Sequence, residues 1–272
     1  MSTLFERADA AIREPDPEAK ADFAIALRSD WDAGRVDIIG AVDEPAPIGE
    51  PGRPSRPELV APRELVQRNL SSLEGRAALV HAIAHIEFNA INLALDAVYR
   101  FRDMPRNYYG DWLRVAAEEA NHFRMLRSRL HQLDYDYGEF PAHNGLWEMC
   151  IDTAHDVLVR MALVPRVLEA RGLDVTPGMI ERLQGAGDGD TVALLEVILA
   201  EEEGHVAIGS HWFRHCCDQR GLEPEATFRD LLQRYMRGRL RGPFNRPARL
   251  VAGFSEAEMD ALERMDRLAE DR

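Results

Sequence analysis

The sequence is almost without lysine. Lys20 is the only one, so 32 of the 33 basic residues in the 272-residue chain are arginine. The 47 acidic residues outnumber them and give a formal net charge of -14. An acidic balance of this size argues against broad, non-specific binding to nucleic acid, which requires a basic surface. The preference for arginine can follow from genome composition, so by itself it does not indicate a function.

Cysteine is also scarce, because only Cys150, Cys216 and Cys217 occur. An odd number with two adjacent residues predicts no disulfide framework and favours a reducing compartment. The first residues are charged and lack the apolar core of a secretory signal. No apolar run approaches the roughly 18 residues that a membrane helix needs. These absences predict a soluble, cytoplasmic protein without a membrane segment.

Alternating strand patterns are missing, and helical spacing dominates the chain. Four long helices are predicted at about 72–102, 107–134, 145–171 and 190–219, with shorter ones near 3–13, 17–33, 177–186, 224–240 and after Ser255. The segment 40–68 is rich in proline and is expected to be extended and to wrap over a body or link to one. Four long helices with short or moderate connections predict an all-α protein built on a four-helix bundle.

Local signals set the expected boundaries of these elements. Asp16 precedes a proline at a helix start, Ser71 and Glu74 have the spacing of a capping box, and Gly172 is expected to end the third long helix. We therefore expect three parts: N-terminal helices with the proline-rich segment (1–71), the bundle (72–220), and a C-terminal helical extension with an arginine-rich loop (221–272).

Two of the long helices carry a carboxylate and an imidazole inside an apolar stripe. In the second helix, Glu119 and His122 fall on the line of core-facing residues that includes Phe123. In the fourth helix, Glu202 and His205 occupy the same kind of position. The helical phase therefore selects these residues from several neighbouring glutamates.

The other two long helices each add one carboxylate to their inner faces, Glu87 and Glu169. The separation from Glu87 to Glu119 is 32 residues, and that from Glu169 to Glu202 is 33. This repeat of residue type and interval predicts two helix pairs of one plan, related by a pseudo-twofold axis. A repeated pattern is far harder to obtain by chance than one Glu-x-x-His.

Four carboxylates cannot remain ionised in an apolar core, because desolvation of each costs several kcal/mol. Two divalent cations would balance their charge. One Glu from each of two helices and Glu-x-x-His from two others is the ligand pattern of di-iron and di-manganese proteins. Oxygen and nitrogen ligands without thiolate favour iron or manganese. The alternative is a bundle without metal, in which Arg166, Arg171 or Arg124 forms salt bridges with the acids.

The four segments that hold these residues also resemble a known superfamily. They are HAIAHIEFNAINLALDA (81–97), WLRVAAEEANHFRMLRSRL (112–130), AHDVLVRMALVPRVLEARGLDVTPGM (154–179) and EVILAEEEGHVAIGSHWF (196–213). The chain resembles the ferritin-like superfamily and, more narrowly over about residues 50–255, a bacterial family of unknown function numbered 455 among such domains. Glu-Ala-Arg at 169–171 and the Glu-x-x-His segments resemble, more distantly, di-iron hydroxylases of isopentenylated adenosine in tRNA. The resemblance implies a di-iron site and O2 chemistry but no particular substrate.

Two further features are candidates for substrate binding. His155 precedes Glu169 by 14 residues, about 21 Å along a straight helix, so it could line a channel; a core histidine partnered by Asp152 is the favoured alternative. Residues 231–255 contain six arginines and no acid. In that segment, Arg239 and Arg241 could hold a phosphate or carboxylate of a substrate such as RNA, although pairing of the arginines with the acidic body is favoured.

The leading hypothesis is a non-haem di-iron oxidoreductase that activates O2 to hydroxylate or oxidise an organic substrate. Its cofactors would be two iron ions, with manganese or a mixed Mn/Fe pair left open. Its partners would be O2, a small-molecule or tRNA-type substrate, and an electron-transfer reductase, and a homodimer is left open. The alternatives are an iron-handling protein (a ferroxidase or a peroxide scavenger) and a non-enzymatic interaction module.

Overall fold

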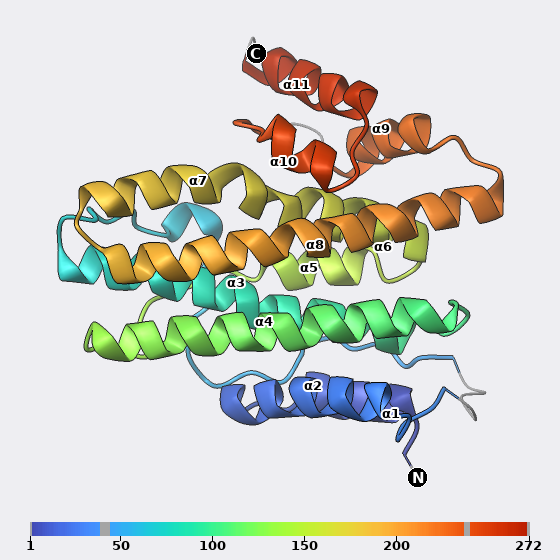
Figure 1. Cartoon of the computed structure of the whole chain (residues 1–272), viewed down its shortest axis with the longest axis horizontal. Helices are drawn as coiled ribbons and strands as arrows, with labels where there is room; N and C mark the ends of the chain where they lie inside the picture. The colour runs from blue at the N-terminus through green and yellow to red at the C-terminus, as the bar shows by residue number, and fades with distance from the viewer. Residues whose placement is uncertain (1, 39–43, 237–239, 271–272) are drawn as a thin grey trace. The chain divides into compact units, whose positions relative to one another are not determined.

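The chain is all-α in the computed structural model, which describes residues 2–38, 44–236 and 240–270. Within these ranges there is no β-strand, and a single isolated bridge joins Leu59 and Ala142. The helices are α1 (Leu4–Arg13), α2 (Pro17–Asp32), η1 (Pro62–Glu64), α3 (Leu73–Arg100), α4 (Arg106–Gln132), α5 (Gly145–Asp152), α6 (Val157–Leu163), η2 (Val164–Glu169), α7 (Ala170–Gly185), α8 (Gly189–Arg220), α9 (Pro224–Tyr235), α10 (Arg246–Val251) and α11 (Glu256–Glu270) (Figure 1). The predicted all-α fold is confirmed.

The chain divides into two compact units. The first contains Met1–Asp152 and Ala186–Leu194, and the second contains Thr153–Gly185 and Leu195–Arg272. Helix α8 begins in the first unit and continues in the second. The division into three parts that the sequence suggests stays a prediction.

Side-chain caps fix the helix starts in the first unit. The Asp16 carboxylate accepts a hydrogen bond from the N–H of Ala19 at 2.8 Å, as its place before the helix predicts. Helix α3 begins one residue later than the predicted capping box, because Ser72 is the N-cap and its hydroxyl accepts from Gly75. Helices α3 and α4 pack along one another, with α1 against α3 and α2 against α4 (Figure 1).

The described part of the proline-rich segment forms hydrogen bonds with helices of the first unit. Its residues 44–61 form no regular helix, and residues 39–43 lie outside the described ranges. The N–H of Gly52 donates to the carbonyl of Ile12 at 2.8 Å, and the indole N–H of Trp147 donates to Gly49 at 2.9 Å. These hydrogen bonds join the segment to α1 and α5.

Helix α3 is the most apolar long element. An 18-residue window of it has a mean hydropathy of 1.3, so by length and composition it could cross a membrane, although the sequence suggested no such run. The fold buries 78% of that window. A buried core helix of a soluble protein passes the same test, so this helix is a weak indication of a membrane segment.

The helix predicted over 145–171 is wrong as a single straight element. Helix α5 ends at Asp152, and α6 begins only at Val157 after a turn. The break has a local cause, since Asp156 caps the new helix by accepting a hydrogen bond from the N–H of Leu158 at 2.8 Å.

The predicted helix end at Gly172 is wrong as well. The backbone widens to π spacing over η2, where Pro165 has no N–H to donate to the preceding turn. Helix α7 then continues to Gly185 and includes Pro177. The π segment changes the phase of the residues after it, so the face on which Glu169 lies does not follow from a straight helical period.

A buried arginine joins several helices of the second unit. Arg166 in η2 is 1% exposed and forms an ion pair with Glu258 at 2.7 Å. Its guanidinium lies 4.7, 4.1 and 4.4 Å from the ring centroids of Phe213, Phe228 and Phe254. This arrangement ties η2 to α8, α9 and α11 by charge and by cation–π contact.

Gly209→Ala is expected to destabilise the protein by about 1–3 kcal/mol. A Cβ at Gly209 in α8 would lie 2.3 Å from the Cβ of Pro165, and the proline ring cannot move without η2. Urea denaturation measures the effect. Gly204→Ala on the same helix is the matched control, because its Cβ would meet nothing within 4 Å and alanine favours the helix by up to about 1 kcal/mol. Equal destabilisation by the two variants would contradict this packing.

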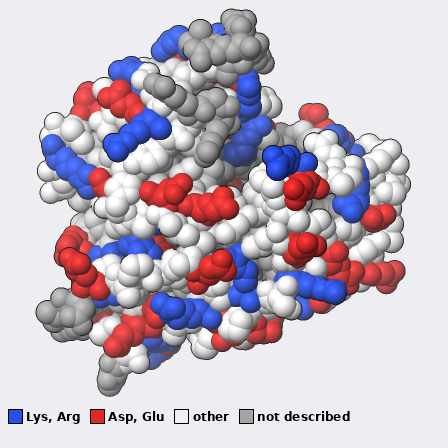
Figure 2. All heavy atoms as spheres, turned by 180° about the vertical axis from the view of Figure 1, so that it is seen from behind, with Lys and Arg blue, Asp and Glu red and all other residues white. Residues whose placement is uncertain are grey.

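Acidic and basic side chains are interspersed on the face shown in Figure 2. Lys20 is fully buried, so the basic groups on this surface are arginines. Many arginines among the described residues have acidic partners; for example, Arg124 pairs with Glu18 at 2.6 Å. This mixture of charge differs from the broad basic surface that non-specific nucleic-acid binding needs.

Candidate metal centre

Three buried side chains from two helices of the first unit meet in its interior. Helix α3 supplies Glu87, and α4 supplies Glu119 and His122 one turn apart. Their exposures are 4%, 1% and 0%. Each sits in an otherwise apolar helix face, with Ala116 and Phe123 buried beside the α4 pair.

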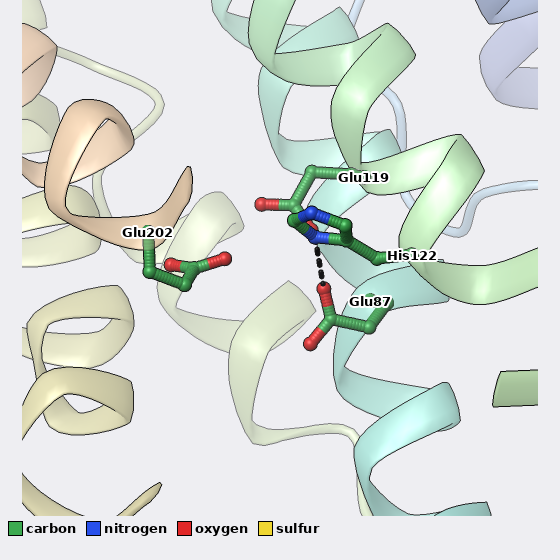
Figure 3. A group of neighbouring side chains, drawn as sticks. All are labelled: Glu87, Glu119, His122 and Glu202. Carbon is green, nitrogen blue, oxygen red and sulfur yellow. Dashed lines mark hydrogen bonds and ion pairs between the residues drawn. The ribbon is translucent and has the colours of Figure 1, made fainter. Parts of the chain in front are cut away.

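The three side chains point toward one another (Figure 3). The Nδ1 atom of His122 lies 3.1 Å from Oε2 of Glu87 and 3.5 Å from Oε2 of Glu119. One ligand atom of each residue lies within 4.8 Å of the ligand atoms of the other two, so the trio could hold a metal ion. The structure therefore brings Glu87, Glu119 and His122 together, and their role as metal ligands stays a prediction.

Burial and neighbouring charges strongly shift the pKa values of Glu87 and His122. Burial raises the pKa of Glu87 well above its usual value, and the charge of Glu119 raises it further. Burial alone would lower the pKa of His122, but hydrogen bonds to Glu119 and Glu87 and their negative charges raise it to about 11. Without a metal ion, these three side chains therefore keep protons that balance the carboxylates. A bound cation would have to displace these protons.

The second unit contains a matching pair on α8. The Nδ1 atom of His205 lies 3.3 Å from Oε1 of Glu202, and the two residues are 0% and 8% exposed. Figure 3 also draws Glu202. Glu169 is half-buried at the end of η2 in the same unit. The roles of Glu169, Glu202 and His205 as ligands stay predictions.

The donor atoms of both pairs suit a divalent ion. Carboxylate oxygens and imidazole nitrogens bind such ions at about 2.0–2.2 Å, so two ligands of one ion are roughly 3 Å apart. The separations of 3.5 Å in Glu119/His122 and 3.3 Å in Glu202/His205 are close to that value. The absence of thiolate from this set favours iron or manganese.

The salt-bridge alternative fails for the three arginines that it invoked. Arg166 pairs with Glu258, Arg124 pairs with Glu18 and Asp22, and Arg171 is 3.5 Å from Asp174. Arg171 also donates to the carbonyl groups of residues 241–243. These arginines do not neutralise the predicted ligands.

His155 is neither a core histidine nor a helix residue. It is exposed in the turn between α5 and α6, and Asp152 is exposed as well. The imidazole Nε2 lies 3.3 Å from the hydroxyl of Tyr235, and the two rings stack with centroids 6.5 Å apart. The expected partnership with Asp152 in the core is wrong, and a role in a substrate channel stays a prediction.

The arginine-rich segment divides into buried, paired and exposed members. Arg249 is buried against Asp174, and Arg246 pairs with Glu256, Asp260 and Glu263. Arg241 is exposed, whereas Arg239 lies outside the described residues. Pairing with acidic residues, the favoured reading of the segment, is thus observed for its C-terminal part.

The sequence missed a polar network along α3. His85 lies two residues from Glu87 and is buried; its Nε2 donates to the carbonyl of His143 at 3.1 Å, so its Nδ1 can accept from the hydroxyl of Tyr137 at 2.9 Å. Asn89 follows one turn later and contacts His85. The repeat of polar residues four positions apart was the available signal.

Comparison with known proteins places most of this chain in one family. The family model described as "Protein of unknown function (DUF455)" matches residues 13–260, which include the predicted ligands. An uncharacterized protein of Haemophilus influenzae is 41% identical over 270 residues, which cover 96% of this chain and 93% of that protein. No solved structure matches the chain.

Proposed function

This chain belongs to the DUF455 family, and from its buried ligand pairs we propose that it is a ferritin-like, non-haem di-iron oxidoreductase. One observation carries the proposal: two helices each bury a Glu-x-x-His pair with the imidazole Nδ1 3.5 or 3.3 Å from the carboxylate. A buried acid and base at metal-ligand spacing occur twice, once in each unit.

In the proposed centre, the two half-sites act together inside a four-helix bundle. Glu87, Glu119 and His122 form one half, and Glu169, Glu202 and His205 form the other. The repeat intervals in the sequence and the matching geometry of the two Glu-x-x-His pairs support this pairing. Two bound iron ions would supply activation of O2 and oxidation of an organic substrate.

The chain's own residues have definable roles in this proposal. Glu87 and Glu119 provide the negative charge that a bound cation would balance in place of protons. His122 releases its proton when its ring nitrogen becomes a ligand. The buried apolar side chains of Phe88, Phe123 and their neighbours keep water from the ligands. The substrate, a reductase partner, a homodimer and a cytoplasmic location remain parts of the proposal.

Anaerobic titration with ferrous iron tests the metal centre. We expect about two ions per chain for the unaltered protein, and no more than half of that for Glu119→Gln. Glu118→Gln is the matched control, because Glu118 is half-buried one position away, off the ligand face. Equal iron content in all three proteins would refute the site.

Oxygen consumption tests the oxidoreductase part separately. Ferrous-loaded protein supplied with a chemical reductant should consume O2 over repeated turnovers, and Glu119→Gln should not. Stoichiometric iron binding without O2 consumption would retain the metal site and remove the proposed reaction.

A further inference from the structure

Lys20 is enclosed at the junction of three helices in the first unit. It lies on α2 and is 0% exposed. Its Nζ atom donates to the carbonyl of Ile12, in the last turn of α1, at 2.6 Å, and to Oδ1 of Asn92 on α3 at 2.5 Å. The nitrogen also lies 5.4 Å from the ring centroid of Phe88. One side chain therefore joins the α1–α2 hairpin to α3.

Both hydrogen-bond acceptors of Lys20 are neutral. Among the described residues, no carboxylate lies within 4.0 Å of its nitrogen, a distance at which an ion pair would form. The C-terminal end of α1 and the Phe88 ring favour a positive charge weakly. The cost of removing an ammonium group from water without a counter-ion is larger than either contribution. The neutral amine is thus the better-suited form of this side chain in the closed structure.

Charged groups on the surrounding elements do not reverse this balance. Glu14, which follows α1, raises the pKa of Lys20, and Arg53 in the proline-rich segment lowers it. Asn92 and Phe88 on α3 carry no charge. On the α4 side, Arg124 is 2.6 Å from Glu18. Burial is the largest influence and lowers the pKa of Lys20 to about 7.

We propose that Lys20 is a proton-operated clasp, which holds the α1–α2 hairpin on α3 as a neutral amine and loosens the hairpin when it is protonated. The device needs no metal ion, and it is independent of the proposed oxidoreductase activity. The sign follows from linkage. Since the closed state binds a proton less readily than the open state, closure is strongest at high pH and weakens as pH falls from about 10 to 7.

The chain's single lysine makes the protonation step directly measurable. Protein labelled with 13C-lysine gives one Cε signal, whose chemical shift reports the charge of Lys20. A midpoint between pH 6 and 8 in the folded protein is expected. A midpoint above pH 9 would overturn the proposal, and this measurement requires no variant.

Hydrogen exchange measures the loosening. After correction for the intrinsic pH dependence of exchange, the opening constant of α1 and α2 amides should be about tenfold larger at pH 6 than at pH 8. Amides of α9 serve as the internal reference and should change little. An α1–α2 opening constant that does not depend on pH would also overturn the clasp.

Two variants separate the charge from the packing. Lys20→Met is uncharged at every pH, so its opening constant should not change between pH 8 and 6. Lys20→Arg is charged throughout, so its opening constant should be as large at pH 8 as at pH 6. If both variants keep the tenfold change of the unaltered protein, another group causes it and the proposal fails.

Discussion

Asp174→Ala is expected to destabilise the protein by about 3–5 kcal/mol, because it leaves a buried arginine without its counter-ion. The Arg249 side chain is 2% exposed, and that of Asp174 is fully buried. Two hydrogen bonds of 2.8 and 2.7 Å join the guanidinium to the two carboxylate oxygens. Asp174 also accepts a hydrogen bond from the N–H of Asn245. The substitution removes all of these contacts from the link between α7 and α10.

Denaturant unfolding of single and double variants separates the cost of the unpaired charge from the cost of the lost hydrogen bonds and packing. The double variant Asp174→Leu/Arg249→Met removes both charges and should be much less destabilised than Asp174→Ala alone, because no unpaired ion remains. Asp174→Asn keeps an acceptor for Asn245 and should fall between them. A loss below 1 kcal/mol for Asp174→Ala would show that Arg249 finds another partner or water.

Glu87→Gln is expected to be more stable than the unaltered protein without metal and less stable than it when iron is added. Without metal at pH 8, the variant should be more stable by about 0.5–2 kcal/mol, since glutamine has no charge for burial to penalise. Free ferrous iron at a thousandfold excess over its dissociation constant should stabilise the unaltered protein by about 4 kcal/mol. The variant should gain much less, because one ligand is lost.

Chemical denaturation under anaerobic conditions, with a chelator or with ferrous iron, provides both comparisons. Glu118→Gln is again the control, and iron should stabilise it as much as the unaltered protein. A purely structural role of Glu87 predicts that Glu87→Gln is less stable in both conditions. That outcome would count against a metal centre.

The buried pairs of Glu and His were predictable where one continuous helix fixes their geometry. In α4 and α8 the Glu and His are three residues apart, so any regular helix brings them to one face. The apolar stripe then showed that this face is buried. Glu87 followed for the same reason, since α3 is a regular helix of 28 residues with a buried inner face.

The position of Glu169 was harder to predict from the sequence. Its phase was inferred from a straight helix over 145–171, but the turn before Val157 and the π segment at η2 change that phase. Pro165 was visible in the sequence as the residue that interrupts a helix. A proline can kink a helix, end it or produce a π segment, and tertiary packing decides among these outcomes. In this protein Pro165 packs closely against Gly209.

Lys20 could have been recognised from the same kind of pattern. It precedes Ala24, Leu27 and Trp31 by 4, 7 and 11 residues, and all of them are buried on one face of α2. A lysine on such a line is usually expected to extend its amine to solvent. Only the folded structure shows that the amine stays in the interior and donates hydrogen bonds to Ile12 and Asn92.

Enclosure of the single ε-amine also decides how the folded protein responds to acylating chemistry. Amine-directed dyes and cross-linkers find no lysine on its surface, and conjugation of an acyl group or a modifier protein to Lys20 requires the hairpin to open first. The cationic surface consists of guanidinium groups, which stay charged wherever the protein is folded. Between mildly acidic and mildly alkaline conditions, the positive charge that arginine gives the exterior is therefore constant.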